Sequence, residues 1–121
     1  MRFMVLVKGD PGVRPPSREA AAAMGRYLND LNRAGVLLAA EALHPSAAGS
    51  RLRVTARERT RIDGPFDDPS ELVVGSVLLI QAGSRAEALE WASRCPVDVA
   101  LGQDEAVDLE IRQVVDVADR G

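Results

Sequence analysis

Three side chains in the middle of the chain have the chemistry needed for proton transfer. His44 is the only histidine, and Glu41 precedes it by three residues. Asp63 begins the segment Asp-Gly-Pro-Phe, where a partly desolvated carboxylate would have a raised pKa suited to a general base. One interpretation pairs His44 with Asp63 or Glu41 as an acid/base couple. The alternative is a surface histidine and a structural turn in which Phe66 anchors the loop in the core.

Charged residues around this segment could bind an anion, because guanidinium groups suit carboxylates and phosphates. Five arginines fall within eleven residues, at positions 51, 53, 57, 59 and 61. We take Arg53 and Arg57 as the candidate anion clamp, with Glu41, Phe66 and Glu71 as further candidate ligand contacts. The alternatives are a solvated strand face or ion pairs across a dimer interface for the arginines, and a solvated acidic loop for Glu71.

The composition argues against several classes of protein. One cysteine, Cys95, and one histidine exclude an internal disulfide framework and a multi-cysteine zinc site, and we predict neither a metal nor a cofactor. A net charge of −3 argues against a nucleic-acid binder. No apolar run approaches the roughly 18 residues of a membrane helix. We therefore expect a cytoplasmic protein with no nucleic-acid or membrane partner.

The first half of the chain predicts a strand, a helix and a second strand. Apolar residues 3–7 precede a Gly- and Pro-rich loop, which is typical of a strand that ends there. Ser17 fits the N-cap of a helix that runs to about Ala34, and Gly35 fits the position that ends it. Residues 36–40 predict a buried strand. The helix's expected apolar stripe consists of Ala20, Met24, Leu28 and Leu31.

Alternation and β-branched residues predict the remaining strands. Residues 51–57 alternate strictly, and residues 59–62 fit a short partner strand that the turn at 63–65 ends. The most apolar run, residues 72–82, predicts a central strand with a bulge or close approach at Gly75. The apolar face of the strand predicted at residues 51–57 consists of Leu52, Val54 and Ala56.

A second helix and a last strand complete the pattern. Ser84 and Glu87 form a capping box for a helix that runs to Arg94, and residues 107–117 alternate as a strand. The order of elements predicts one α+β domain over residues 1–121, a ferredoxin-like sandwich with an antiparallel sheet and two helices on one face. A second subunit would cover the other face. The expected apolar face of the second helix consists of Ala88, Leu89, Ala92 and Cys95.

An ordered set of motifs resembles a known family. Asp-Gly-Pro-Phe at 63–66, Glu71-Leu72 with Gly75, and the capped helix that ends at Arg94-Cys95-Pro96 resemble the DGPF-type branch of the YCII-related proteins, along almost the whole chain. The resemblance implies a dimeric α/β barrel, in which two ferredoxin-like sheets face each other. Some relatives in the wider superfamily act on small aromatic compounds. DGPF-type members are also often encoded beside, or fused to, sigma factors.

Two hypotheses of function follow from the residues and the resemblance. The first is a homodimeric small-molecule-binding protein or enzyme, with Asp63 at the centre of a pocket and His44 as its acid/base partner. Its ligand would be a small organic acid or an aromatic compound. The second is a non-enzymatic interaction or regulatory module with a sigma factor as its partner. No P-loop, Rossmann glycine pattern or serine elbow in the sequence decides between them.

Overall fold

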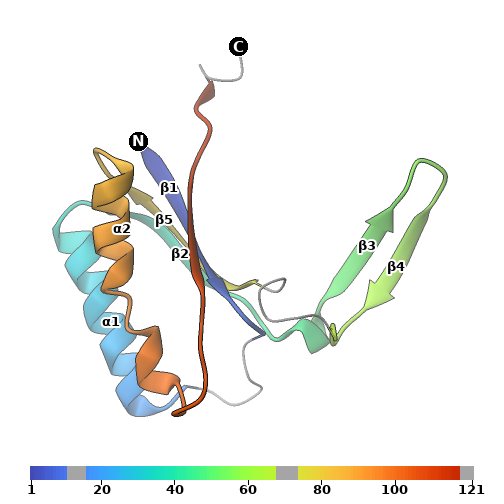
Figure 1. Ribbon diagram of the computed structural model, residues 1–121, viewed down its shortest axis with the longest axis horizontal. Helices are drawn as coiled ribbons and strands as arrows, with labels where there is room; N and C mark the ends of the chain where they lie inside the picture. Colours follow the sequence, from blue (N-terminus) through green and yellow to red (C-terminus); the bar gives the residue numbers. More distant parts are fainter. Residues whose placement is uncertain (11–15, 68–73, 118–121) are drawn as a thin grey trace.

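Four antiparallel strands form the central sheet in the part of the chain that the computed structural model describes, residues 1–10, 16–67 and 74–117. Where residues 2–8 pair with residues 74–81, the register passes from Val7–Ser76 to Lys8–Val74, which confirms the predicted bulge at Gly75. Along the sheet the order is β2-β5-β1-β6 (Figure 1). These strands are β1 (Arg2–Lys8), β2 (Leu37–Ala42), β5 (Val74–Gln81) and β6 (Leu109–Gln113). The last strand is therefore shorter than the predicted 107–117.

Both helices lie on one side of this sheet (Figure 1). Helix α1 (Arg18–Arg33) connects β1 to β2, and α2 (Arg85–Ser93) connects β5 to β6. The predicted caps are confirmed: the Ser17 hydroxyl accepts a bond from the Ala20 N–H, and the Ser84 hydroxyl accepts one from the Glu87 N–H. Gly35 follows α1 with φ +71°, a left-handed conformation that favours glycine. None of the described helices is both long and apolar enough to cross a membrane.

The hydrophobic core lies between the helices and the sheet. Phe3 and Val5 of β1 and Ile80 of β5 face the helices and are fully buried. On α1 the buried residues are Ala20, Ala23, Tyr27 and Leu31, whereas Met24 and Leu28 of the predicted stripe are only partly buried. The predicted stripe on α1 is therefore rotated slightly from the real one.

Tyr27 is not part of the predicted stripe, but it is buried in the core although it carries a polar group. Its hydroxyl donates a 2.8 Å hydrogen bond to the Trp91 carbonyl on α2, so burial leaves no unpaired donor. Burial raises the pKa of Tyr27 to about 12. On α2, Ala88, Ala92 and the following Cys95 are buried as predicted, but Leu89 is 47% exposed, which corrects the predicted face.

The opposite face of the sheet is also apolar at its centre. Met4 pairs with Leu79, and Leu6 pairs with Val77, so these four side chains share the face that points away from the helices. We call this group the outer face. The strand order and the two helices on one side confirm the α+β, ferredoxin-like fold class. The dimeric barrel, which would place a second sheet against the outer face, stays a prediction.

A separate two-stranded hairpin interrupts the fold between β2 and β5. After a 3-10 turn, η1 (Ser46–Ala48), the strands β3 (Ser50–Val54) and β4 (Arg59–Asp63) pair only with each other. The hairpin extends from the sheet on the side away from the helices (Figure 1). The partner strand predicted at 59–62 is confirmed.

We expect Leu31→Ala to lower the free energy of unfolding by about 2–5 kcal/mol, because Leu31 is fully buried between helix and sheet. The matched variant Leu89→Ala should lower it by only about 0.5 kcal/mol, because that side chain is half exposed. Urea unfolding followed by circular dichroism measures both. Equal losses in the two variants would contradict the orientation of α1 and α2 described above.

Candidate functional site

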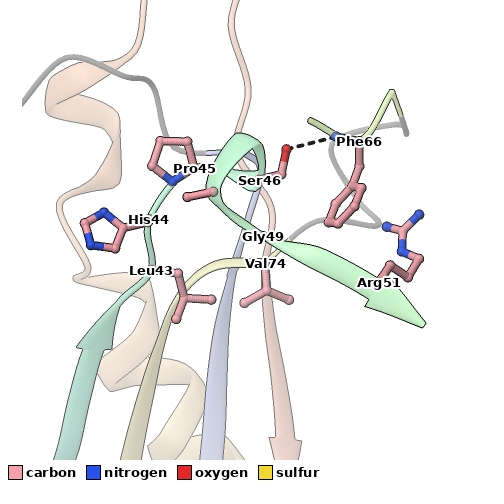
Figure 2. A pocket seen from close by; sticks show the side chains of 9 residues that line it. Leu43, His44, Pro45, Ser46, Gly49, Arg51, Phe66 and Val74 are labelled. Atoms are coloured by element: carbon pink, nitrogen blue, oxygen red, sulfur yellow. Dashed lines mark hydrogen bonds between the residues drawn. The ribbon is translucent and has the colours of Figure 1, made fainter. Parts of the chain in front are cut away.

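A pocket of about 360 Å³ lies where β2, the hairpin and the start of β5 meet. Leu43 and His44 follow β2, Arg51 belongs to β3, Phe66 follows β4, and Val74 begins β5. Figure 2 shows His44 on one side and Phe66 with Arg51 on the other, with Leu43 and Val74 between them. The pocket thus combines an apolar floor with cationic and aromatic groups.

Ser46 joins three separate segments beside this pocket. It is only 7% exposed, and its backbone N–H donates a 2.7 Å bond to a carboxylate oxygen of Asp10, which follows β1. The Ser46 hydroxyl donates to the other oxygen of the same carboxylate. The Phe66 N–H donates a 3.0 Å bond to the Ser46 hydroxyl oxygen (Figure 2). One buried serine therefore ties the end of β1, the turn η1 and the segment after the hairpin together.

Gly64 lets the end of the hairpin approach this serine closely. A Cβ atom at position 64 would lie 1.7 Å from the Ser46 carbonyl oxygen, so no other residue fits without a backbone shift. The Gly64 N–H also donates a 2.9 Å bond to the Gly49 carbonyl, which closes the base of the hairpin. The glycine of the Asp-Gly-Pro-Phe segment therefore has a structural role, and it brings Phe66 to the pocket.

Arg51 and Phe66 together line one side of the pocket. The guanidinium carbon of Arg51 lies 4.1 Å from the centroid of the Phe66 ring, which is a cation–π contact. This contact orients a planar donor group at the pocket rim, where guanidinium N–H groups suit a carboxylate. Among the predicted ligand contacts that lie in the described ranges, Phe66 is thus the one that the structure brings together with an arginine.

Asp63 does not line this pocket. Its carboxylate accepts 2.8 Å bonds from the Ser50 hydroxyl and from Nε of Arg61, and its side chain is 61% exposed. These bonds, that of Ser50 first, lower the pKa of Asp63. The expected desolvated carboxylate with a raised pKa is therefore wrong, and a lowered pKa makes Asp63 a weaker base.

The other predicted site residues are dispersed. Glu41 lies on β2 opposite Val77, and no hydrogen bond or ion pair among the described residues joins His44 to Glu41 or Asp63. Arg53 faces Thr60 within the hairpin, and Arg57 lies in its turn, where its N–H donates to the Thr55 hydroxyl. Glu71 lies outside the described residues. The proposed couple of His44 with an acid is thus not assembled.

Three polar residues of the site were missed as ligand contacts or supports: Asp10, Ser46 and Arg51. Asp10 stands in a Gly-Asp-Pro sequence and Ser46 follows a proline, and both contexts are typical of side chains that bond to nearby backbone. Arg51 is one of five similar arginines, and only the hairpin geometry distinguishes it. No group of three or more His, Cys, Asp or Glu side chains in the described ranges could hold a metal ion.

We expect Asp10 to stabilise the protein in a pH-dependent way. The bonds from Ser46 lower the pKa of Asp10 below its ordinary value of 3.8, so their contribution is fully present above about pH 5 and is lost as the pH falls through the folded-state pKa. Asp10→Asn should therefore lose stability at pH 7, and its difference from the wild type should shrink toward pH 2. Urea unfolding at a series of pH values measures this difference.

Ser46→Ala supplies the control. In that background the pH dependence of the Asp10→Asn effect should be smaller, because the hydroxyl bond is gone. An effect of Asp10→Asn that is the same at every pH in the wild-type background would contradict the assignment.

Comparison with known proteins supports the architecture. A search of the curated proteins gives no match. Among protein families, the YCII-related domain matches residues 1–112, which include both helices, the hairpin, every residue of the pocket and all of the sheet except Gln113. This chain therefore belongs to the YCII-related family.

Proposed function

We propose that the protein binds a small organic anion with a flat apolar body in the pocket between His44 and Phe66. The observation that carries this proposal is the Arg51 guanidinium stacked 4.1 Å from the Phe66 ring at the pocket rim. The ligand's carboxylate would face Arg51, and its apolar body would lie against Phe66, Leu43 and Val74. A volume of about 360 Å³ suits a ligand near the small end of the usual range.

The proposal differs from the sequence-based one in its polar centre. The charged group of the pocket is the Arg51 guanidinium and not the Asp63 carboxylate, so the pocket is suited to holding an anion rather than to abstracting a proton. His44 is the pocket group best suited to acid/base chemistry. We therefore propose binding as the primary activity. The Asp-Gly-Pro-Phe segment, whose glycine meets Ser46, supports assignment to the DGPF-type branch. A sigma-factor partner and a cytoplasmic location stay predictions.

We expect benzoate to bind, and Arg51→Gln to weaken its binding about tenfold or more, since a hydrogen bond to a charged group contributes about 1.5–3 kcal/mol. Arg53→Gln is the matched control, because Arg53 lies two residues along the same strand but does not line the pocket. Isothermal titration calorimetry measures the affinities. Acetate and benzyl alcohol, which each lack one half of the ligand, should bind more weakly than benzoate.

Equal losses in Arg51→Gln and Arg53→Gln would show a diffuse charge effect and would contradict the pocket. Failure of the wild type to bind benzoate, with the fold intact by circular dichroism, would also count against the proposal. In that case the regulatory module would become the better hypothesis.

We also propose that the outer face is the interface of a homodimer. Met4, Leu6, Val77 and Leu79 form an apolar strip across the two central strands, and burying such side chains is favourable. Light scattering at micromolar concentration should give a mass near twice 12.9 kDa. A mass near 12.9 kDa across the concentration series would contradict the dimer.

A further inference from the structure

Two large apolar side chains of the β3–β4 hairpin are exposed to solvent. Leu52 is 63% exposed and Val54 is 54% exposed. They lie on one face of the hairpin, because Leu52 pairs with Arg61 and Val54 pairs with Arg59. A two-stranded hairpin is marginally stable by itself, and unpaired strand edges invite association. The hairpin therefore has an exposed apolar face, and a partner that covered this face would stabilise the hairpin.

The charge of the hairpin is opposite to that of the rest of the chain. Residues 50–63 carry five arginines against Glu58 and Asp63, whereas the whole chain has a net charge of −3. The rest of the chain is therefore acidic. Arg59 and Arg61 share the face with Leu52 and Val54. Charge complementarity thus favours an acidic partner, and the acidic body of this same chain is one.

The position of the hairpin fits the same partner. It extends on the side of the sheet away from the helices, which is the side of the outer face (Figure 1). A second copy packed on the outer face would therefore lie next to the hairpin. On the sheet strands that border this face, Glu41 of β2 and Glu110 of β6 are exposed carboxylates, and Glu110 also forms 3.9 Å ion pairs with Lys8 and Arg112 of its own chain.

We propose that the β3–β4 hairpin is an arm that clasps a second copy of this chain. Leu52 and Val54 lie on apolar surface of the second copy, and Arg59 and Arg61 face its carboxylates. The proposal rests on the homodimer proposed above but concerns a different surface. The arm adds contact area beyond the two facing sheets and supplies the cover that its own apolar face lacks.

The test is the double variant Leu52→Ser/Val54→Ser, compared with Leu89→Ser on α2, which changes an exposed leucine away from the arm. Sedimentation velocity measures the dimer dissociation constant. The arm variant should raise it at least about tenfold, because it removes two buried apolar side chains from the interface, and Leu89→Ser should change it by less than about twofold. Arg59→Glu/Arg61→Glu should weaken the dimer as well, most strongly at low salt.

Hydrogen exchange on the wild-type protein tests the arm without any substitution. Backbone amides of β3 and β4 should exchange more slowly at concentrations where the dimer forms than where it dissociates. A dimer whose arm amides exchange at the same rate at both concentrations would overturn the arm and leave the dimer standing. An unchanged dissociation constant in Leu52→Ser/Val54→Ser would do the same. A chain that sediments as a monomer throughout would overturn both proposals.

Discussion

The contacts of Ser46 are the constraint on which the rest of the site depends. The central sheet and the hairpin share no strand pairing among the described residues, so something else must fix one relative to the other. Ser46 does so by bonding Asp10 at the end of β1 and accepting a bond from the Phe66 N–H after β4. The serine is buried, whereas the Asp10 carboxylate that accepts two of these bonds is exposed. The close approach of Gly64 completes the junction.

The two faces of the central sheet differ in how far their apolar side chains are buried. One face is closed by α1 and α2 over Phe3, Val5 and Ile80, and this core accounts for the fold. The other face keeps an apolar centre with Met4 and Leu79 only partly buried. The pocket lies at the end of the sheet, where β2 and β5 meet the hairpin, so its lining comes from strand ends and from the segments that follow them.

Features of the fold that depend on local sequence were predictable, and those that depend on distant pairing were not. Ser17, Gly35 and the Ser84–Glu87 box act within one helical turn, so their residue types suffice. The ferredoxin-like class followed from the order of such elements. Tyr27 entered the core because Trp91, far away in sequence, offers a carbonyl.

The candidate site shows the same difference between features set by local sequence and features set by distant pairing. The segment at 63–66 was recognised as a turn that places Phe66, but its aspartate was assigned to a pocket. In the folded chain Ser50, the residue paired with Asp63 across the hairpin, takes up that carboxylate. Nothing in the sequence distinguishes Arg51 from Arg53, because only strand register decides which of them meets the Phe66 ring.

The base of the hairpin has a mechanical consequence. The Gly64–Gly49 bond clamps the two strands together where they leave the body, so a tilt of the whole hairpin would turn about a point at the pocket wall. Arg51 is next to that pivot on one strand, and Phe66 follows it on the other. Such a tilt of the distant turn would therefore change the separation of the groups that line the cavity. A contact that held the tip in one position would then also restrict the shape of the cavity, and by thermodynamic reciprocity a molecule bound in the cavity would bias the position of the tip.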